Sequence, residues 1–185
     1  MDKNQSDIGL FNQIRHGNTL ALTQLFDRYY QQLCQFTFIY IPDRELTEEL
    51  TANVFINLWE KRSTLHIHTS LKAYLYRSAK NQALSSLRKN RHLTYPPNAE
   101  ADKPEVSNQT PETLFIENEL NDQFARAIKQ LPQRAKLAFK LHRIDNLSYS
   151  ETAEIMNISI SAVEKNLTTA LEILHRELSC ITKID

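Results

Sequence analysis

The 185-residue sequence is poor in several residue types, and each shortage excludes a class of protein. It holds two glycines and two cysteines, so it has no glycine-rich phosphate loop, and His66 and His68 have no further ligand at metal spacing. No apolar run reaches membrane-spanning length, and the first residues are not a signal peptide. These shortages predict a reduced, cytoplasmic protein with no metal, no cofactor, no enzymatic activity and no membrane insertion.

The formal net charge is zero, but the charges are sorted into blocks. Residues 61–99 hold eight basic residues and no acidic one, whereas residues 100–123 hold seven acidic residues and one lysine. A neutral total argues against tight autonomous binding to DNA, because neutralised phosphates supply much of that affinity. The basic block favours local contact with nucleic acid. The sequence therefore predicts a protein that a larger partner delivers to DNA.

The pattern of apolar residues predicts an all-α fold. Strand-like alternation is scarce, and the stretch from Leu93 to Pro111 holds four prolines and few apolar residues. Such a stretch cannot build a core and is typical of a flexible linker. We therefore expect two small helical domains, residues 1–93 and 112–185, joined by a flexible linker at 94–111.

Four helices are predicted in the first domain. They span residues 8–15, 19–40, from the cap Asp43 to about Lys61, and from Leu71 onward. The third has a core-like stripe at Leu46, Leu50, Val54 and Leu58. Its acidic residues fit a solvated face as well as a docking surface.

The fourth helix is basic. Leu71, Leu75, Ala79 and Leu87 can pack inward, which leaves a polar set for the other faces. Lys and Arg can follow phosphates, a Tyr ring can stack on an unpaired base, and Asn can recognise a base edge. A solvated basic face is the alternative, but the lack of acids favours nucleic acid. The polar set is Lys72, Tyr74, Arg77, Lys80, Asn81, Ser85, Arg88 and Lys89.

The segment from Ser148 to Leu174 has the pattern of a helix-turn-helix. Ser148 and Glu151 have capping-box spacing, Asn157 tolerates the left-handed conformation at a helix end, and Ser159 can cap the second helix. We expect an apolar stripe at Val163, Leu167, Leu171, Leu174 and Leu178. The opposite face carries Ser161, Ala162, Glu164, Lys165, Thr168 and Thr169, and short polar side chains of this kind suit the major groove.

These segments, in this order, resemble the extracytoplasmic-function (ECF) sigma factors of bacterial RNA polymerase. LFDRYYQQL, DRELTEELTANVFINLWE and LKAYLYRSAKNQALSSLRK resemble sigma domain 2. The stretch from LPQRAKLAF to TTALEIL resembles sigma domain 4. The low-glycine, asparagine-rich sequence is most similar to the iron-transport-regulator-like branch common in Bacteroidetes. The resemblance implies a sigma factor that binds core RNA polymerase, directs it to promoter DNA and helps to melt the −10 element.

The resemblance also implies roles for single residues. The third helix would bind the β′ clamp of the polymerase through Glu48, Glu49, Asn53 and Phe55. The polar set on the fourth helix would recognise the −10 element, with Asn81 and Ser85 on the non-template strand and the loop 62–70 around a flipped base. In the second domain, Ser161, Glu164, Lys165 and Thr168 would recognise the −35 element, and Arg143 and Tyr149 would contact phosphates.

The same resemblance implies two further partners, and the sequence differs from the family at several positions. The β flap would pack on the second domain, and an anti-sigma factor would restrain the protein. The family usually has basic residues where Asn166 and Thr169 stand, and an acid-Gln-Glu arrangement before Val54. The alternative function is an autonomous helix-turn-helix transcriptional regulator, which would need a dimer surface and a more basic recognition domain.

Overall fold

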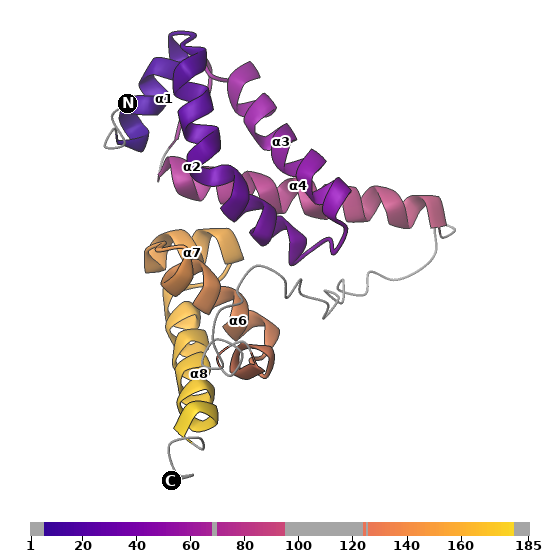
Figure 1. Cartoon of the computed structure of the whole chain (residues 1–185), viewed down its shortest axis with the longest axis vertical. Coiled ribbons are helices and arrows are strands. Elements are labelled where there is room, and N and C mark those ends of the chain that lie inside the picture. The colour runs from indigo at the N-terminus through magenta and orange to yellow at the C-terminus, as the bar shows by residue number, and fades with distance from the viewer. Residues whose placement is uncertain (1–5, 68–69, 95–123, 125, 180–185) are drawn as a thin grey trace. The chain divides into compact units, whose positions relative to one another are not determined.

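The computed structural model describes residues 6–67, 70–94, 124 and 126–179, and every regular element in these ranges is a helix (Figure 1). The chain divides into two compact units, Met1–Thr110 and Pro111–Asp185. The expected all-α class with two helical domains is therefore confirmed. The expected linker lies outside the described residues except for Thr94, and the domain boundaries at 93 and 112 stay a prediction.

In the first unit, local side-chain caps set where the helices begin. The elements are α1 (Asp7–Arg15), α2 (Thr19–Phe38), α3 (Arg44–Glu60) and α4 (Leu71–Thr94). The side chain of Asn18 accepts hydrogen bonds from the first turn of α2, and the Asp43 side chain accepts one from the Leu46 N–H at 3.0 Å. Gly17 has φ +84, a left-handed conformation that suits glycine between two helices.

The core of this unit is built where α2, α3 and α4 pack together. Phe36 of α2 and Tyr76 of α4 are fully buried, with ring centroids 5.0 Å apart. The expected inward residues Leu71, Leu75 and Ala79 are buried, whereas Leu87 is only half-buried. At the edge of the unit, Asp7 of α1 accepts hydrogen bonds from Arg28 and Tyr29 of α2.

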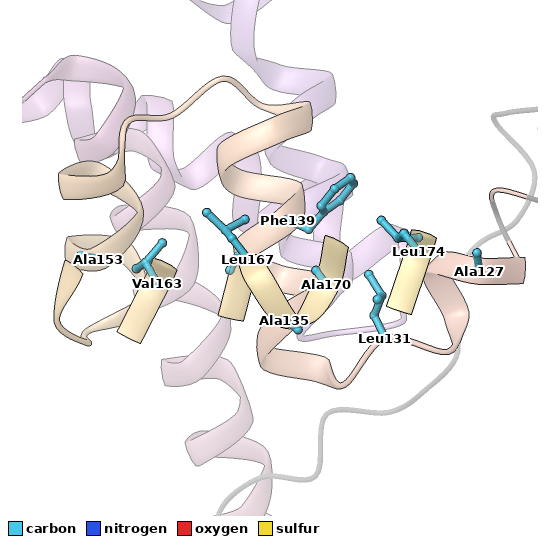
Figure 2. Packing of buried hydrophobic residues seen from close by; sticks show 10 residues of the cluster. Ala127, Leu131, Ala135, Phe139, Ala153, Val163, Leu167, Ala170 and Leu174 are labelled. Atoms are coloured by element: carbon cyan, nitrogen blue, oxygen red, sulfur yellow. The ribbon is translucent and has the colours of Figure 1, made fainter. Parts of the chain in front are cut away.

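The second unit contains α6 (Gln133–Phe139), a π-helical turn η1 (Lys140–Ile144), α7 (Tyr149–Met156) and α8 (Ile160–Ser179). Residues 126–129 are helical as well. Figure 2 shows its apolar core, to which α6, α7 and α8 all contribute. The members labelled there are Ala127, Leu131, Ala135, Phe139, Ala153, Val163, Leu167, Ala170 and Leu174.

The predicted helix-turn-helix is confirmed in its local geometry. Ser148 Oγ accepts from the Glu151 N–H at 3.2 Å, and the Glu151 carboxylate accepts from the Ser148 N–H at 2.8 Å, which completes the capping box. Asn157 ends α7 with φ 57 and ψ 50. Ser159 Oγ then accepts from the Ala162 N–H at 3.2 Å and caps α8.

The predicted apolar stripe on α8 is wrong at one position. Leu171 is 43% exposed, whereas Ala170 is fully buried beside Val163, Leu167 and Leu174. At about 100° per residue, those four buried side chains fall within about 60° of one another, and Leu171 lies about 80° from Val163. The expected i, i+4, i+8 spacing drifts away from the buried side of a 3.6-residue helix.

Candidate nucleic-acid interface

The outer face of α8 is polar at its N-terminal end. Ser161, Glu164, Lys165 and Thr168 are all exposed, while the opposite side of the helix packs into the core of the unit. Ser161, Glu164 and Thr168 lie within about 60° around the helix, and Lys165 lies about 40° beyond Ser161. The structure thus brings together the four residues that were expected on one surface.

Several side chains of α8 are bonded to the backbone of their own helix. Thr168 Oγ1 donates to the Glu164 carbonyl and Thr169 Oγ1 to the Lys165 carbonyl, both at 3.0 Å. Asn166 Nδ2 donates to the Ala162 carbonyl at 2.6 Å. Asn166 and Thr169 are also half-buried. The side chains at these two positions, where the resemblance implies basic residues, therefore bond to the backbone of their own helix.

The corner before α7 is held by a buried ion pair. Lys140 Nζ lies 3.0 Å from both carboxylate oxygens of Asp145, and Asp145 is only 4% exposed. The backbone N–H of Asp145 donates to the Lys140 carbonyl at 2.8 Å, so the pair closes the same π-helical turn. Sequence periodicity gives no sign of this turn, because a π-turn adds one residue to the helical repeat.

This corner presents Arg143 and Tyr149 to solvent. The Tyr149 ring is tilted against the His142 ring with centroids 4.3 Å apart, and Tyr149 stays 39% exposed. His142 Nδ1 donates to the Leu147 carbonyl at 2.7 Å, which fixes the imidazole. Arg143, the next residue, is exposed. Both expected phosphate contacts therefore lie beside the start of α7.

The basic helix α4 has an exposed polar stripe. Arg77, Asn81, Ser85 and Arg88 are exposed and lie within about 80° around the helix, and Lys89 is exposed beside them. The other three expected residues, Lys72, Tyr74 and Lys80, are half-buried. Burial lowers the pKa of the Lys80 amine. The exposed stripe can meet a nucleic-acid strand. Tyr74 lies on the same side of the helix, Lys80 lies about 60° from Arg77, and Lys72 lies on the opposite side.

The loop after α3 lies against α1. Arg62 stacks over the Trp59 ring at 4.2 Å and donates to the Trp59 carbonyl at 2.7 Å, which anchors the start of the loop. A hollow of about 620 Å³ opens between α1 and the end of the loop. Its lining includes Phe11, Asn12 and Arg15 of α1 together with Leu65, His66 and Ser70. The sequence predicts the loop 62–70 but gives no sign that α1 forms the other wall of this hollow. Residues 68–69 of the loop lie outside the described part.

The outer face of α3 differs from the expected one at a single position. Glu49 is exposed and Asn53 half-exposed, while Glu48 accepts a hydrogen bond from Arg44 Nε at 2.9 Å. Phe55 is only 3% exposed and packs against Phe26 with ring centroids 4.9 Å apart, so it belongs to the core.

The exposed apolar residue of this helix is Ile56, at 51%. It lies within about 60° of Glu49 and Asn53 around α3. We therefore place Ile56, in place of Phe55, on the candidate partner surface of α3.

The two units correspond to two parts of one known family. The family model described as Sigma-70 region 2 matches residues 25–93, and the one described as Sigma-70, region 4 matches residues 121–174. Together they cover about two thirds of the chain. The chain belongs to the ECF group of the sigma-70 family. The helix-turn-helix thus belongs to a sigma factor and not to an autonomous regulator.

Known relatives are similar over almost the full length. The ECF RNA polymerase sigma-E factor of Escherichia coli (strain K12) is 24% identical over 188 residues, covering 96% of this chain and 97% of the relative. The ECF RNA polymerase sigma factor SigW of Bacillus subtilis (strain 168) is 24% identical over 175 residues, covering 90% and 93%.

Two solved structures share the fold of this ECF sigma factor. CnrH, solved in complex with the cytosolic domain of CnrY, matches with a TM-score of 0.62 at 18% identity, over 95% of this chain and 99% of that chain. The sigma factor RpoE of Bartonella quintana, solved with the anti-sigma factor NepR, matches with a TM-score of 0.58 at 20% identity, over 85% and 96%. In the part of the chain that the structure describes, no helix is both long and apolar enough to span a membrane.

Proposed function

We propose that this sigma factor binds the β′ clamp of core RNA polymerase through α3, melts the −10 element with α4, and holds the −35 element with α7 and α8. The observation that carries the proposal is the capped helix-turn-helix, whose second helix turns an exposed polar face away from its core. The protein does no catalysis of its own and acts in the cytoplasm beside the polymerase.

Recruitment by the polymerase is the first part to test. The chain has no net charge, and phosphate neutralisation supplies most non-specific affinity for DNA. We expect the free protein to bind promoter duplex weakly and the complex with core polymerase to bind and transcribe it specifically. Gel shift and transcription assays with and without core polymerase test this. Nanomolar, sequence-specific binding by the free protein at physiological salt would contradict it.

The surface on α3 has a direct test. Ile56→Asp places a charge in an exposed apolar contact, so it should weaken association with core polymerase while leaving the fold intact. Asp27→Lys on α2 is the control, because Asp27 is also exposed but lies on another helix. Affinity capture of the polymerase by each variant measures the difference. Equal capture by Ile56→Asp and the unchanged protein would remove this surface from the proposal.

The role of α4 can be separated from polymerase binding. Asn81 is exposed between Arg77 and Ser85, so its amide can pair with a base that becomes accessible only after strand separation. We expect Asn81→Ala to reduce open complexes without weakening capture of the polymerase. Gln32→Ala, an exposed amide on α2, is the matched control. Permanganate footprinting measures the bubble, and normal footprints with Asn81→Ala would exclude this role.

Further partners complete the proposal. The β flap would pack on apolar side chains exposed in the second unit, such as Ile144 and Leu171, which are 47% and 43% exposed. An anti-sigma factor is supported by RpoE, which was solved with one. The anti-sigma factor should compete with the polymerase for the α3 surface, and it should bind the Ile56→Asp variant more weakly. Assignment to the iron-transport-regulator-like branch rests on sequence composition. Promoter mapping that finds no iron-uptake genes would argue against it.

A further inference from the structure

The exposed face of α8 contains an acid where DNA would approach. Glu164 is exposed between Ser161 and Thr168 on the first two turns. Within the part of the chain that the structure describes, no cation pairs with its carboxylate. A carboxylate on a groove-facing helix is repelled by the phosphates. We therefore expect the Glu164 carboxylate to accept a hydrogen bond from a donor on a base edge.

The major groove offers an amino donor at two bases, cytosine and adenine. Cytosine presents its N4 amino group, and Glu or Asp is the side chain that accepts from it. Adenine also presents an amino group, but its neighbouring N7 is an acceptor that repels a carboxylate and favours the amide of Asn or Gln. Glu164 is therefore suited to cytosine.

Thr168 offers a different contact. Its hydroxyl donates to the Glu164 carbonyl at 3.0 Å, so the hydroxyl proton is already used inside the helix. This hydrogen bond also selects the side-chain rotamer. The exposed side chain then offers a partner its methyl group and an acceptor oxygen, but no donor. In the major groove, a threonine methyl packs against the C5-methyl of thymine.

We propose that α8 recognises a −35 element with a cytosine contacted by Glu164 and a thymine contacted by Thr168. The two residues are separated by about 6 Å along the helix, and successive base pairs are about 3.4 Å apart. The two bases should then lie within about two base pairs of each other, on either strand. This inference rests on the proposed function of α8 in binding the −35 element.

The experiment uses the full chain bound to core polymerase and a promoter library randomised at the −35 and −10 elements. The unchanged protein should enrich cytosine at one −35 position by about tenfold over the other bases. Glu164→Gln should shift that position to adenine, because an amide pairs with adenine N6 and N7. Glu172→Gln is the control, since it removes the same charge from an exposed site two turns further along α8 and should leave the preference unchanged.

A second measurement tests Thr168 without relying on the first. Replacing the selected thymine by uracil removes one methyl group and should weaken binding of the unchanged holoenzyme by about fourfold. Thr168→Ser should show the same loss on thymine DNA and no further loss on uracil DNA. Thr168→Val keeps a methyl group and should retain the thymine preference.

The outcomes separate the inference from the function on which it rests. A library with no enriched −35 position would refute −35 binding by α8, and the inference with it. A clear −35 preference that Glu164→Gln leaves at the same base would overturn the inference alone. So would a uniform gain in affinity for all −35 sequences, because Glu164 would then act only as a repulsive charge. Equal binding of uracil and thymine DNA would overturn the Thr168 contact.

Discussion

Removing one partner of the buried ion pair between Lys140 and Asp145 should strongly destabilise the second unit. Both carboxylate oxygens of Asp145 lie 3.0 Å from Lys140 Nζ, and the two side chains are only 3% and 15% exposed. Asp145→Ala would leave the Lys140 ammonium largely desolvated with its carboxylate partner removed. Breaking a buried pair in this way costs about 3–5 kcal/mol. We expect about 3 kcal/mol, because the small exposure of Lys140 lets water compensate in part.

The assay can report the two units separately. Trp59, the single tryptophan of the chain, lies in the first unit, so its fluorescence follows unfolding of that unit. Far-UV circular dichroism follows the helices of both. In urea, Asp145→Ala should shift one circular-dichroism transition to lower concentration while the Trp59 transition stays in place. A loss of about 3 kcal/mol is a large part of the stability of a small domain.

A double-mutant cycle checks the cause. Lys140→Met alone should also destabilise, and the double variant should recover part of the loss, because replacing both charges by apolar groups is often close to neutral. We expect a coupling free energy of about 2 kcal/mol. The reasoning would be refuted by a loss below about 1 kcal/mol for Asp145→Ala, the range of an exposed pair. A coupling near zero would refute it too.

Three further outcomes are expected. Ser148→Ala should lower the free energy of unfolding of the second unit by about 1 kcal/mol in the same urea assay, because it removes the cap of α7. Burial raises the pKa of the Cys34 thiol, so in a Cys180→Ser background labelling at pH 8 should be slower than in the denatured chain. In the folded chain, the alkylation rate of Cys34 should still rise at pH values above the ordinary pKa of a thiol. Equal alkylation rates in the folded and the denatured chain would contradict the raised pKa. Limited proteolysis should cut first between residues 94 and 111, because their proline-rich sequence lacks a core. First cleavage within a helix would argue against a linker there.

Local capping was predictable from the sequence because each cap depends on residues a few positions apart. Ser148 and Glu151 make both bonds of the capping box, and Asn157 adopts the left-handed conformation expected of it. Neither depends on which helix packs against α7. The same holds for Asn18 and Asp43, whose side chains accept from the first turns of α2 and α3.

The orientation of neighbouring apolar residues was harder to predict. Phe55 and Ile56 are adjacent, and only the packing of α3 against α2 decides that Phe55 is buried and Ile56 exposed. On α8, the same kind of choice buries Ala170 and exposes Leu171. A one-residue error turns a side chain by about 100°, which is enough to move it from the core to a partner surface.

Side-chain bonding on α8 was not predictable from residue types at all. Thr168 has a donor, an acceptor and a methyl group, and the sequence does not say which of them faces outward. The bond to the Glu164 carbonyl uses the donor and leaves the methyl group and the acceptor oxygen for a partner. The wall that α1 adds to the hollow near Leu65 and His66 is also a tertiary feature, since α1 lies about 50 residues earlier in the chain.

The distribution of charge supports our proposal that this protein binds promoters only together with the polymerase. The exposed cations Arg77, Arg88 and Lys89 are on α4, whereas the start of α8 carries Lys165 beside the acid Glu164. Each neutralised phosphate adds affinity that is independent of sequence, so α8 gains little of that non-specific binding. Contacts to base edges carry the sequence information, but they do not supply this sequence-independent attraction. Specificity without strong non-specific binding is useful only when a larger partner holds the protein on DNA, and the outer face of α3, with Glu49 and Ile56, is the surface that we propose for that attachment.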